Sequence, residues 1–283
     1  MEETKQPRIK ILVACHKADP NIRQDDIYMP IQVGKALHPE LDLGFQCDNT
    51  GDNISEKNGS YCELTALYWA WKNLKDVDYI GLCHYRRYFD YSNSDIRANV
   101  PLTQWQPKNE KSHLLKLISP STILASRRNI YPYSVALDYA RSHHSDDLKV
   151  LYAIIQQQFS TYKNAFDDAI LNSNASCPYN MFIASWETFN EYCSFLFPLL
   201  EEVERQTSTR DYNDYQKRLI GFLAERLMNV YLSKKTKEGF KIKTLPVMWI
   251  TEDVFPSSKI HYLINWVRYN LSFHISKPTN PSF

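Results

Sequence analysis

The order of apolar runs in the first 90 residues restricts this chain to a parallel α/β fold. Ile9 to Cys15 and Tyr79 to Cys83 are short apolar runs of the kind that form strands buried on both faces. Asp42 to Cys47 predicts a weaker strand between them, and the apolar spacing from about Tyr61 to Leu74 predicts an amphipathic helix. Strand, turn, strand, helix and strand in this order indicate a half-sheet that binds a nucleotide.

Polar side chains follow each of the three predicted strands. His16 and Lys17 come after the first, Asp48 to Asn53 after the second, and His84 to Arg87 after the third. Carboxyl ends of parallel strands meet at one edge of a sheet, and ligands bind in the crevice beyond that edge. Because the planar fork of arginine suits phosphate, the third group predicts a bound anion, such as the phosphate of a nucleotide.

The remainder of the chain predicts a helix-rich second half. Apolar spacing indicates helices over residues 133–143, 146–159, 162–171, 186–205 and 213–232, with strands over 179–184 and 241–250. The helix from about Tyr61 has Ser60 and Glu63 spaced as a capping box. We expect an α/β fold with a mainly parallel sheet flanked by helices. Residues 1–253 form the main domain and residues 254–283 a C-terminal basic and aromatic helix with a tail.

Charge and cysteine content narrow the class of protein. The 283 residues carry 33 Lys and Arg against 32 Asp and Glu, which excludes binding to nucleic acid through overall charge. The six cysteines show no C-x-x-C spacing and are expected to be reduced. Because the N-terminus has no leader-like apolar segment and no run of about 18 apolar residues occurs, we expect a cytoplasmic or peripheral protein.

Several long motifs resemble one bacterial protein family. The motifs are Asp48-Asn-Thr-Gly-Asp-Asn-Ile-Ser-Glu-Lys-Asn58, Cys62-Glu-Leu-Thr-Ala-Leu-Tyr-Trp-Ala-Trp-Lys-Asn73, Tyr79-Ile-Gly-Leu-Cys-His-Tyr-Arg-Arg-Tyr-Phe89, Tyr139-Ala-Arg-Ser-His-His-Ser-Asp-Asp-Leu148, Tyr179-Asn-Met-Phe-Ile183 and Gly221-Phe-Leu-Ala-Glu-Arg-Leu227. They are similar to a family long catalogued as a domain of unknown function. That family looks like the glycosyltransferases of capsule, exopolysaccharide and lipopolysaccharide O-antigen assembly.

The resemblance implies a single-domain fold of the glycosyltransferase A type. The implied reaction transfers a hexose, with galactose and galactofuranose as candidates, from a UDP-sugar donor to a glycan or lipid-linked glycan acceptor. An alternative function is a module that binds nucleotide or glycan without turnover. A transfer reaction would need a catalytic carboxylate that the binding module does not need.

The strand end at His84 departs from most enzymes of that class. They carry an Asp-x-Asp sequence there, which holds a divalent metal against the diphosphate. Here His84-Tyr85-Arg86 stands in that place, and Asp76-Val-Asp78 precedes the strand and so falls at the opposite edge of the sheet. If arginines neutralise the diphosphate, no metal cofactor is required, and we expect metal-independent activity.

Donor-binding candidates come from the three strand ends. Arg86 and Arg87 are adjacent, so they point to different sides of an extended segment and at least one is expected to bind the diphosphate. His16 and Lys17 add positive charge. Asp48, Asp52 and Asn53 lie where ribose or base would be bound, although Asp and Asn are also ordinary turn residues.

Catalytic and acceptor candidates are fewer. Glu225 is the candidate general base, because Gly221 one turn earlier would leave an open notch above its carboxylate; the alternative is an ion pair with Arg226 or Arg218. His84 is a candidate for assisting the leaving group. The resemblance adds His143 and His144 as sugar or acceptor residues, and Asn180 is either a sugar contact or a structural amide.

The C-terminal segment predicts a helix over residues 257–277 with two alternative roles. No acidic residue follows Asp253, whereas Lys259, Arg268 and Lys277 accompany rows of aromatic and aliphatic residues. This pattern is typical of a helix that lies on a membrane surface, here the inner face of the plasma membrane. Because only three basic residues support that interpretation, a helix packed on its own domain is the favoured alternative.

Overall fold

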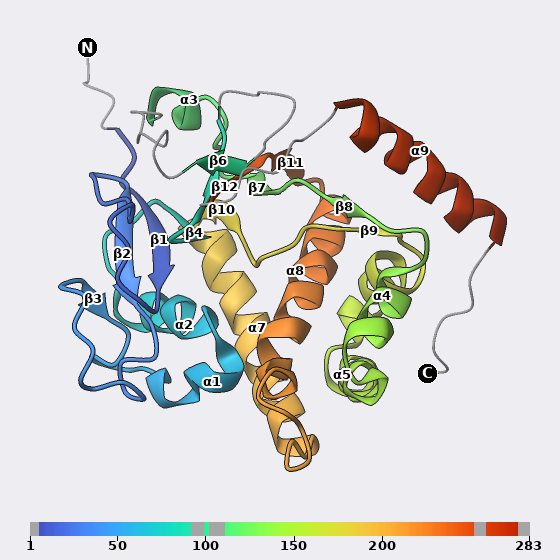
Figure 1. Cartoon of the computed structure of the whole chain (residues 1–283), viewed down its shortest axis with the longest axis horizontal. Coiled ribbons are helices and arrows are strands. Elements are labelled where there is room, and N and C mark those ends of the chain that lie inside the picture. The colour runs from blue at the N-terminus through green and yellow to red at the C-terminus, as the bar shows by residue number, and fades with distance from the viewer. Residues whose placement is uncertain (1–5, 92–98, 102–110, 252–258, 277–283) are drawn as a thin grey trace.

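Twelve strands are present in the parts of the chain that the structure describes. The structure is a computed structural model, and it describes residues 6–91, 99–101, 111–251 and 259–276 (Figure 1). The strands are β1 (Ile9–Cys15), β2 (Tyr28–Gln32), β3 (Gln46–Cys47), β4 (Tyr79–His84), β5 (Arg87–Phe89), β6 (Asn99–Pro101), β7 (Thr122–Ser126), β8 (Asn129–Ile130), β9 (Ala175–Ser176), β10 (Phe182–Ser185), β11 (Lys241–Leu245) and β12 (Val247–Thr251).

The main sheet is mostly parallel. Its strands run in the order β11-β7-β10-β4-β1-β2-β3, and β5, β6 and β12 extend it. β1 pairs in parallel with both β2 and β4, while β10 runs antiparallel to β4 and β7. The carboxyl ends of β1 and β4 therefore meet at one edge, as the sequence predicts.

Alternating side chains of each strand supply two hydrophobic cores. In β1, Leu12 and Ala14 face a large core shared with the helices, whereas Ile11 and Val13 face a smaller core on the other side. All four residues are buried, which explains why this strand reads as one continuous apolar run.

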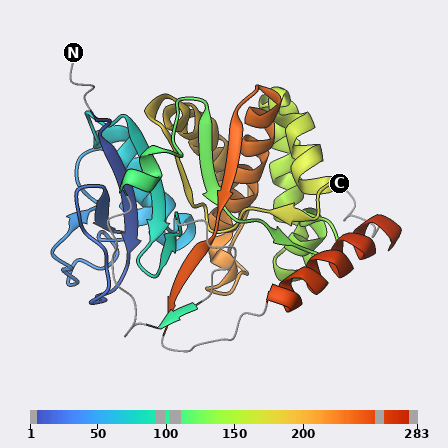
Figure 2. The same ribbon diagram turned by 90° about the horizontal axis from the view of Figure 1, so that it is seen from above.

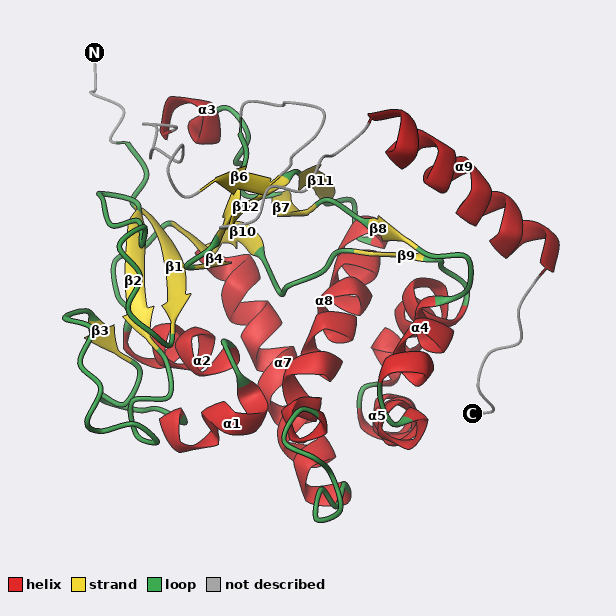
Figure 3. Ribbon diagram, viewed as in Figure 1, coloured by secondary structure: helices red, strands yellow, loops and turns green. Residues whose placement is uncertain are grey.

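Nine helices accompany the sheet within the described residues. They are α1 (Asn58–Tyr61), α2 (Leu64–Asn73), α3 (Lys111–Leu115), α4 (Val135–Ser142), α5 (Ser145–Gln158), α6 (Lys163–Phe166), α7 (Trp186–Gln206), α8 (Leu219–Lys237) and α9 (Lys259–Ser276). Residues of α2, α4, α5, α7 and α8 fill the larger core, and Figures 2 and 3 show these helices beside the strands. Ser134 and Ser185 cap α4 and α7 by accepting backbone N–H bonds from Leu137 and Thr188.

The predicted α/β class with its flanking helices is confirmed, but the second strand is placed wrongly. β2 occupies residues 28–32, and only Gln46 and Cys47 of the predicted 42–47 segment form a strand. β2 has the sequence Tyr-Met-Pro-Ile-Gln, which does not predict a strand because proline lacks the N–H that a sheet needs. Pro30 is tolerated because β3 pairs with β2 only at Ile31 and Gln32.

The helix predicted from Tyr61 is interrupted, and its capping box is wrong. Cys62 has a positive φ of 52°, which ends α1 before α2 begins at Leu64. Ser60 lies inside α1, and Glu63 precedes α2 without a side-chain capping bond. The Glu63 carboxylate instead accepts a hydrogen bond from Asn180.

Other boundaries also shift where the chain turns. β10 begins at Phe182 rather than at 179, and Pro246 separates β11 from β12 within the predicted 241–250 strand. The predicted 162–171 helix becomes α6 followed by a π-helix, Asp167–Leu171. Residues 91–107 are polar and include Pro and Asn, which predicts a loop, and this segment lies mostly outside the described residues. The division at residue 253 stays a prediction.

Candidate active site

A cavity of about 720 Å³ opens at the carboxyl ends of β1 and β4. Its lining residues include His16, Glu63, His84, Arg86, Arg87, Tyr179, Arg218, Glu225 and Trp249. They come from the two strand ends, the break before α2, the turn before β10, the start and middle of α8, and β12. The cavity thus lies at the predicted edge of the sheet.

Arg87 is held between two aromatic rings in this cavity. Its guanidinium carbon lies 4.4 Å from the ring centroid of Trp249 and 4.7 Å from that of Tyr179. Cation–π contacts of this kind fix the guanidinium while its N–H groups can still bond an anion. In the described part of the chain, no carboxylate forms a salt bridge with Arg87.

Arg86 also reaches the cavity, but it has a protein partner. Its Nε donates to Asp19 at 2.7 Å, and the Asp19 side chain is only 1% exposed. A carboxylate so covered needs a compensating cation, so part of the charge of Arg86 is used within the fold. Arg218, just before α8, supplies a further guanidinium, whose Nε lies 3.3 Å from Cys62 Sγ.

Of the two candidates after the first strand, His16 lines the cavity and Lys17 does not. His16 lines the cavity and meets Tyr85 edge to face at 5.3 Å between ring centroids. Lys17 is exposed, with its Nζ 6.0 Å from the Tyr85 ring centroid, and it is not part of the cavity wall.

A left-handed turn at Tyr179 and Asn180 connects three polar groups of the site. The φ angles of these residues are 76° and 53°, which costs about 1 to 3 kcal/mol per residue when neither is glycine. His84 Nε2 donates to the carbonyl of Tyr179 at 2.8 Å, and the N–H of Tyr179 donates to Glu225 Oε1 at 3.3 Å. Asn180 Nδ2 donates to Glu63 Oε1 at 2.8 Å.

These contacts change the expected role of His84. A carbonyl oxygen only accepts, so the ring proton of His84 resides on Nε2 and is already used. Burial also lowers the pKa of His84, which favours the neutral ring. A ring in this state has no spare proton for a leaving group, and His84 instead positions the turn that contacts Glu225.

Glu225 is a cavity residue whose carboxyl group has a perturbed pKa. Burial raises the pKa of its carboxyl group, and the nearby charge of Arg226 offsets part of that increase. Glu225 Oε2 lies 3.5 Å from Arg226 Nη1, so the ion pair foreseen as an alternative is present while the carboxylate still lines the cavity. The Arg226 guanidinium also bonds Asp138.

The expected notch at Gly221 is wrong. A Cβ atom at this position would lie 3.1 Å from Cys62 Sγ and 3.5 Å from the carbonyl oxygen of Ser60. Glycine is therefore needed for close packing of α8 against the chain between α1 and α2. This packing brings Arg218 and Glu225 of one segment to the same cavity as Glu63 of the other.

Sequence reasoning missed Glu63, Arg218, Tyr179 and Trp249. The spacing of Glu63 from Ser60 matches a capping box, and nothing in the sequence indicates that Glu63 contacts Asn180. Asn180 is fully buried, and its Oδ1 has no hydrogen-bond partner among the described residues. This structural contact supports the amide interpretation of Asn180, while a sugar contact stays a prediction.

The acidic group after the second strand is not at the cavity. Asp48 is fully buried and accepts bonds from the N–H groups of Gly34 and Lys35, at 2.8 and 3.2 Å. Asp52 accepts from the Tyr68 hydroxyl, and Asn53 bonds within its own turn. Ribose or base binding by these residues is not supported, because β3 lies beyond β2 rather than beside β4.

His143 and His144 also lie outside the cavity wall. His143 stacks on Phe222 with ring centroids 4.0 Å apart, and burial lowers its pKa to about 4. His144 stacks on Tyr212 at 4.2 Å. His143 is half-buried and His144 is exposed, and neither lines the cavity, so the sugar or acceptor role expected from the motif is not supported.

The donor atoms at the strand end do not suit a divalent metal. Residues 6–91, 99–101, 111–251 and 259–276 include no group of three or more His, Cys, Asp or Glu able to hold an ion. His84 is bonded through Nε2, and its neighbours Arg86 and Arg87 are cations. Asp76 and Asp78 bind Arg8, at the start rather than the end of β4.

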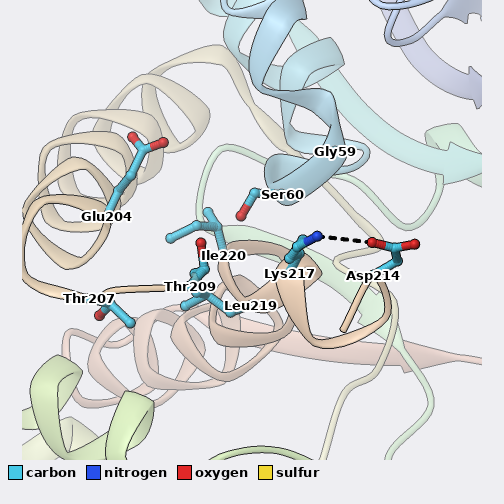
Figure 4. Close-up of a pocket in the computed structure, with 9 residues that line it drawn as sticks. All are labelled: Gly59, Ser60, Glu204, Thr207, Thr209, Asp214, Lys217, Leu219 and Ile220. Carbon is cyan, nitrogen blue, oxygen red and sulfur yellow. Dashed lines mark hydrogen bonds and ion pairs between the residues drawn. The ribbon is translucent and has the colours of Figure 1, made fainter. Parts of the chain in front are cut away.

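A second cavity of about 430 Å³ lies beside the first, and Gly59 lines both. Figure 4 shows the paired Lys217 and Asp214 and the hydroxyl groups of Ser60 and Thr209 around it. Thr207 Oγ1 is buried with no partner among the described residues. This wall offers hydroxyl and carboxylate groups and no arginine, so it suits a polyhydroxylated ligand better than a phosphate.

Comparison with known proteins gives one family match and one similar solved structure. Residues 10–237 match the model of a family described as Domain of unknown function (DUF4422). Among solved structures, the chain is similar to the apo structure of the WbbM bifunctional glycosyltransferase, with a TM-score of 0.73 and 30% identity over 89% of this chain. The chain spans 48% of that protein, about half of its length. None of the curated proteins matches.

Proposed function

The chain belongs to the family described as Domain of unknown function (DUF4422), and on that premise we propose that it is a glycosyltransferase. The observation that carries the proposal is the presence of Arg87, held by two aromatic rings, in one cavity with the carboxylate of Glu225. The similarity to a glycosyltransferase over 89% of the chain supports it. The expected type A fold and the place in capsule, exopolysaccharide or O-antigen synthesis are part of this proposal.

The donor is a UDP-hexose bound with its diphosphate at the basic side of the cavity. Arg87 and Arg218 donate to the phosphate oxygens, and Arg86 contributes charge from its pair with Asp19. Galactose and galactofuranose are the candidate sugars. The protein side chains supply the positive charge that a metal supplies in other enzymes, so no metal cofactor is needed. Activity that EDTA abolishes and Mn²⁺ restores would refute this part.

The transfer step uses Glu225 as the base. The acceptor hydroxyl oxygen forms a bond to the anomeric carbon of the sugar while the bond from that carbon to the phosphate oxygen breaks. The bonding electrons leave with UDP, and the hydroxyl proton passes to Glu225. Glu63, held by Asn180, accepts hydrogen bonds from sugar hydroxyls beside it.

The acceptor glycan occupies the second cavity. The hydroxyl groups of Ser60, Thr209 and Thr207, the last of which has no partner among the described residues, supply donors and acceptors for sugar hydroxyl groups. Because Gly59 lines both cavities, an acceptor bound there can extend one hydroxyl toward Glu225.

The test measures donor binding and transfer separately. Thermal shift with a panel of nucleotides and UDP-sugars, with and without Mn²⁺, identifies the donor. The Glu225→Gln variant keeps the shape of the side chain and should bind the donor normally but transfer about 10² to 10⁴ times more slowly. Unchanged transfer by this variant would eliminate Glu225 as the base. Donor binding by the wild type without transfer to any acceptor would favour the non-catalytic binding module.

A further inference from the structure

The C-terminal helix presents its apolar side chains to solvent. Six of the nine exposed large hydrophobic residues in the described part of the chain belong to α9. Leu263 is 60% exposed and Ile275 is 77% exposed. Figures 1 and 2 show α9 at the periphery, and its contact with the body of the protein is beside β8.

The exposed residues form one continuous face of α9. At 100° per residue, Leu263, Val267 and Leu271 fall on one side, with Ile264 and Ile275 beside them. The half-buried side chains of this helix, which include Tyr269 and Phe273, lie on the other side. Asn270, also half-buried, accepts a bond from Asn174 of the body at 3.3 Å. A helix packed only to complete the domain would have the reverse orientation.

The charges of the C-terminal segment indicate what binds the apolar face of α9. Residues 254–283 include no Asp or Glu, whereas Lys259, Arg268 and Lys277 are basic. Pairing with a second copy of the face would bring like charges together, whereas anionic lipid headgroups complement them. Trp266, 46% exposed at the flank of the face, is a side chain typical of the membrane–water boundary.

We infer that α9 binds the surface of an anionic lipid bilayer, with its apolar face lying among the headgroups. No helix among the residues that the structure describes is long and apolar enough to cross a bilayer, so the contact is peripheral. The inference rests on α9 alone and does not depend on the proposed transfer reaction.

Vesicle flotation of the full chain tests the inference. The wild type should float with vesicles that contain phosphatidylglycerol and bind pure phosphatidylcholine vesicles at least tenfold more weakly. The reason is that each basic residue near an anionic surface increases the binding constant roughly fivefold. The triple variant Leu263→Ser, Val267→Ser and Leu271→Ser should bind the vesicles with phosphatidylglycerol at least tenfold more weakly than the wild type. Leu37→Ser is the matched control, because Leu37 is 45% exposed but lies outside α9.

A second variant separates charge from apolar burial. Arg268→Glu leaves the apolar face unchanged and should remove most of the preference for anionic vesicles, as high salt should in the wild type. Circular dichroism establishes that each variant is folded. Equal flotation of the wild type and the triple variant, or no flotation of the wild type, would overturn the inference. So would a wild-type dimer, seen by sedimentation without vesicle binding, that the triple variant dissociates.

Discussion

Replacing Arg87 by alanine should remove donor binding while leaving the fold almost intact. Its guanidinium contacts the rings of Trp249 and Tyr179 and forms no salt bridge with a carboxylate in the described residues. The fold therefore loses only two cation–π contacts, about 0.5 to 1 kcal/mol each at a half-exposed site. For a chain of this length, we expect the melting temperature to fall by a few degrees, about 2 to 4 °C per kcal/mol.

The effect on donor affinity should be larger. A hydrogen bond from arginine to a phosphate oxygen contributes about 1.5 to 3 kcal/mol, and a forked pair contributes somewhat more than one such bond. A loss of about 3 kcal/mol corresponds to roughly a 100-fold rise in the Kd of the UDP-sugar. Lysine keeps the charge but not the planar fork, so Arg87→Lys should raise the Kd of the UDP-sugar roughly 10-fold.

Calorimetric titration with a UDP-sugar and with uridine provides the assay. Only the UDP-sugar should lose affinity, because uridine carries no phosphate. Arg86→Ala is the contrasting variant: it removes the cation beside the covered carboxylate of Asp19 and should destabilise the fold by about 2 kcal/mol. If Arg87→Ala bound the UDP-sugar as tightly as the wild type, the assignment of the diphosphate site would be refuted.

Three further predictions concern acid–base behaviour and packing. Because burial raises the pKa of Glu225, the transfer rate should fall on acidification with an apparent pKa above that of an ordinary glutamate, and a midpoint at or below the ordinary value would contradict this. The folded-state pKa of His143 is about 4, so the unfolded chain takes up the proton first and stability should drop by about 1 to 2 kcal/mol between about pH 6.5 and about pH 4. Urea unfolding of His143→Phe, which can still stack on Phe222, should show a smaller drop, and an identical drop would disprove the cause. Gly81→Ala places a Cβ 2.6 Å from a backbone oxygen of β10 and should destabilise the fold by about 2 kcal/mol or more. Gly59→Ala, in α1, meets nothing within 4 Å and should leave stability unchanged or raise it by up to about 1 kcal/mol in the same unfolding assay.

Local patterns predicted the parts of the fold that depend on local burial. β1 and β4 are buried on both faces, so every residue between Ile9 and Cys15 except Lys10 is apolar. β2 was not predicted because it contains Pro30, and proline is rare inside strands. Pro30 fits there only because β3 is short and pairs with Ile31 and Gln32 alone. The break at Cys62 also had no signal, because cysteine rarely takes a positive φ.

The candidate site was predictable only where a strand end defines it. Arg87 and His84 follow β4 directly, and their approach to the cavity follows from the parallel sheet. Arg218 and Trp249 reach the same place through tertiary packing of α8 and β12, which no local pattern shows. Asp48 has the chemistry of a ligand, but its neighbours Gly34 and Lys35 use its carboxylate to hold their loop.

The Tyr179–Asn180 turn has a consequence for the order in which the protein acquires its site. The bond from His84 spans 95 positions of sequence, the bond to Glu63 spans 117, and the bond to Glu225 spans 46. Contacts between such distant positions form only after the long intervening loops have closed, which makes them late and slow steps in folding. A folding intermediate that has its helices and strands but lacks this turn would not yet hold the carboxylates of Glu63 and Glu225 in place. The ability to bind a ligand in the cavity should therefore recover after the bulk of the secondary structure during refolding.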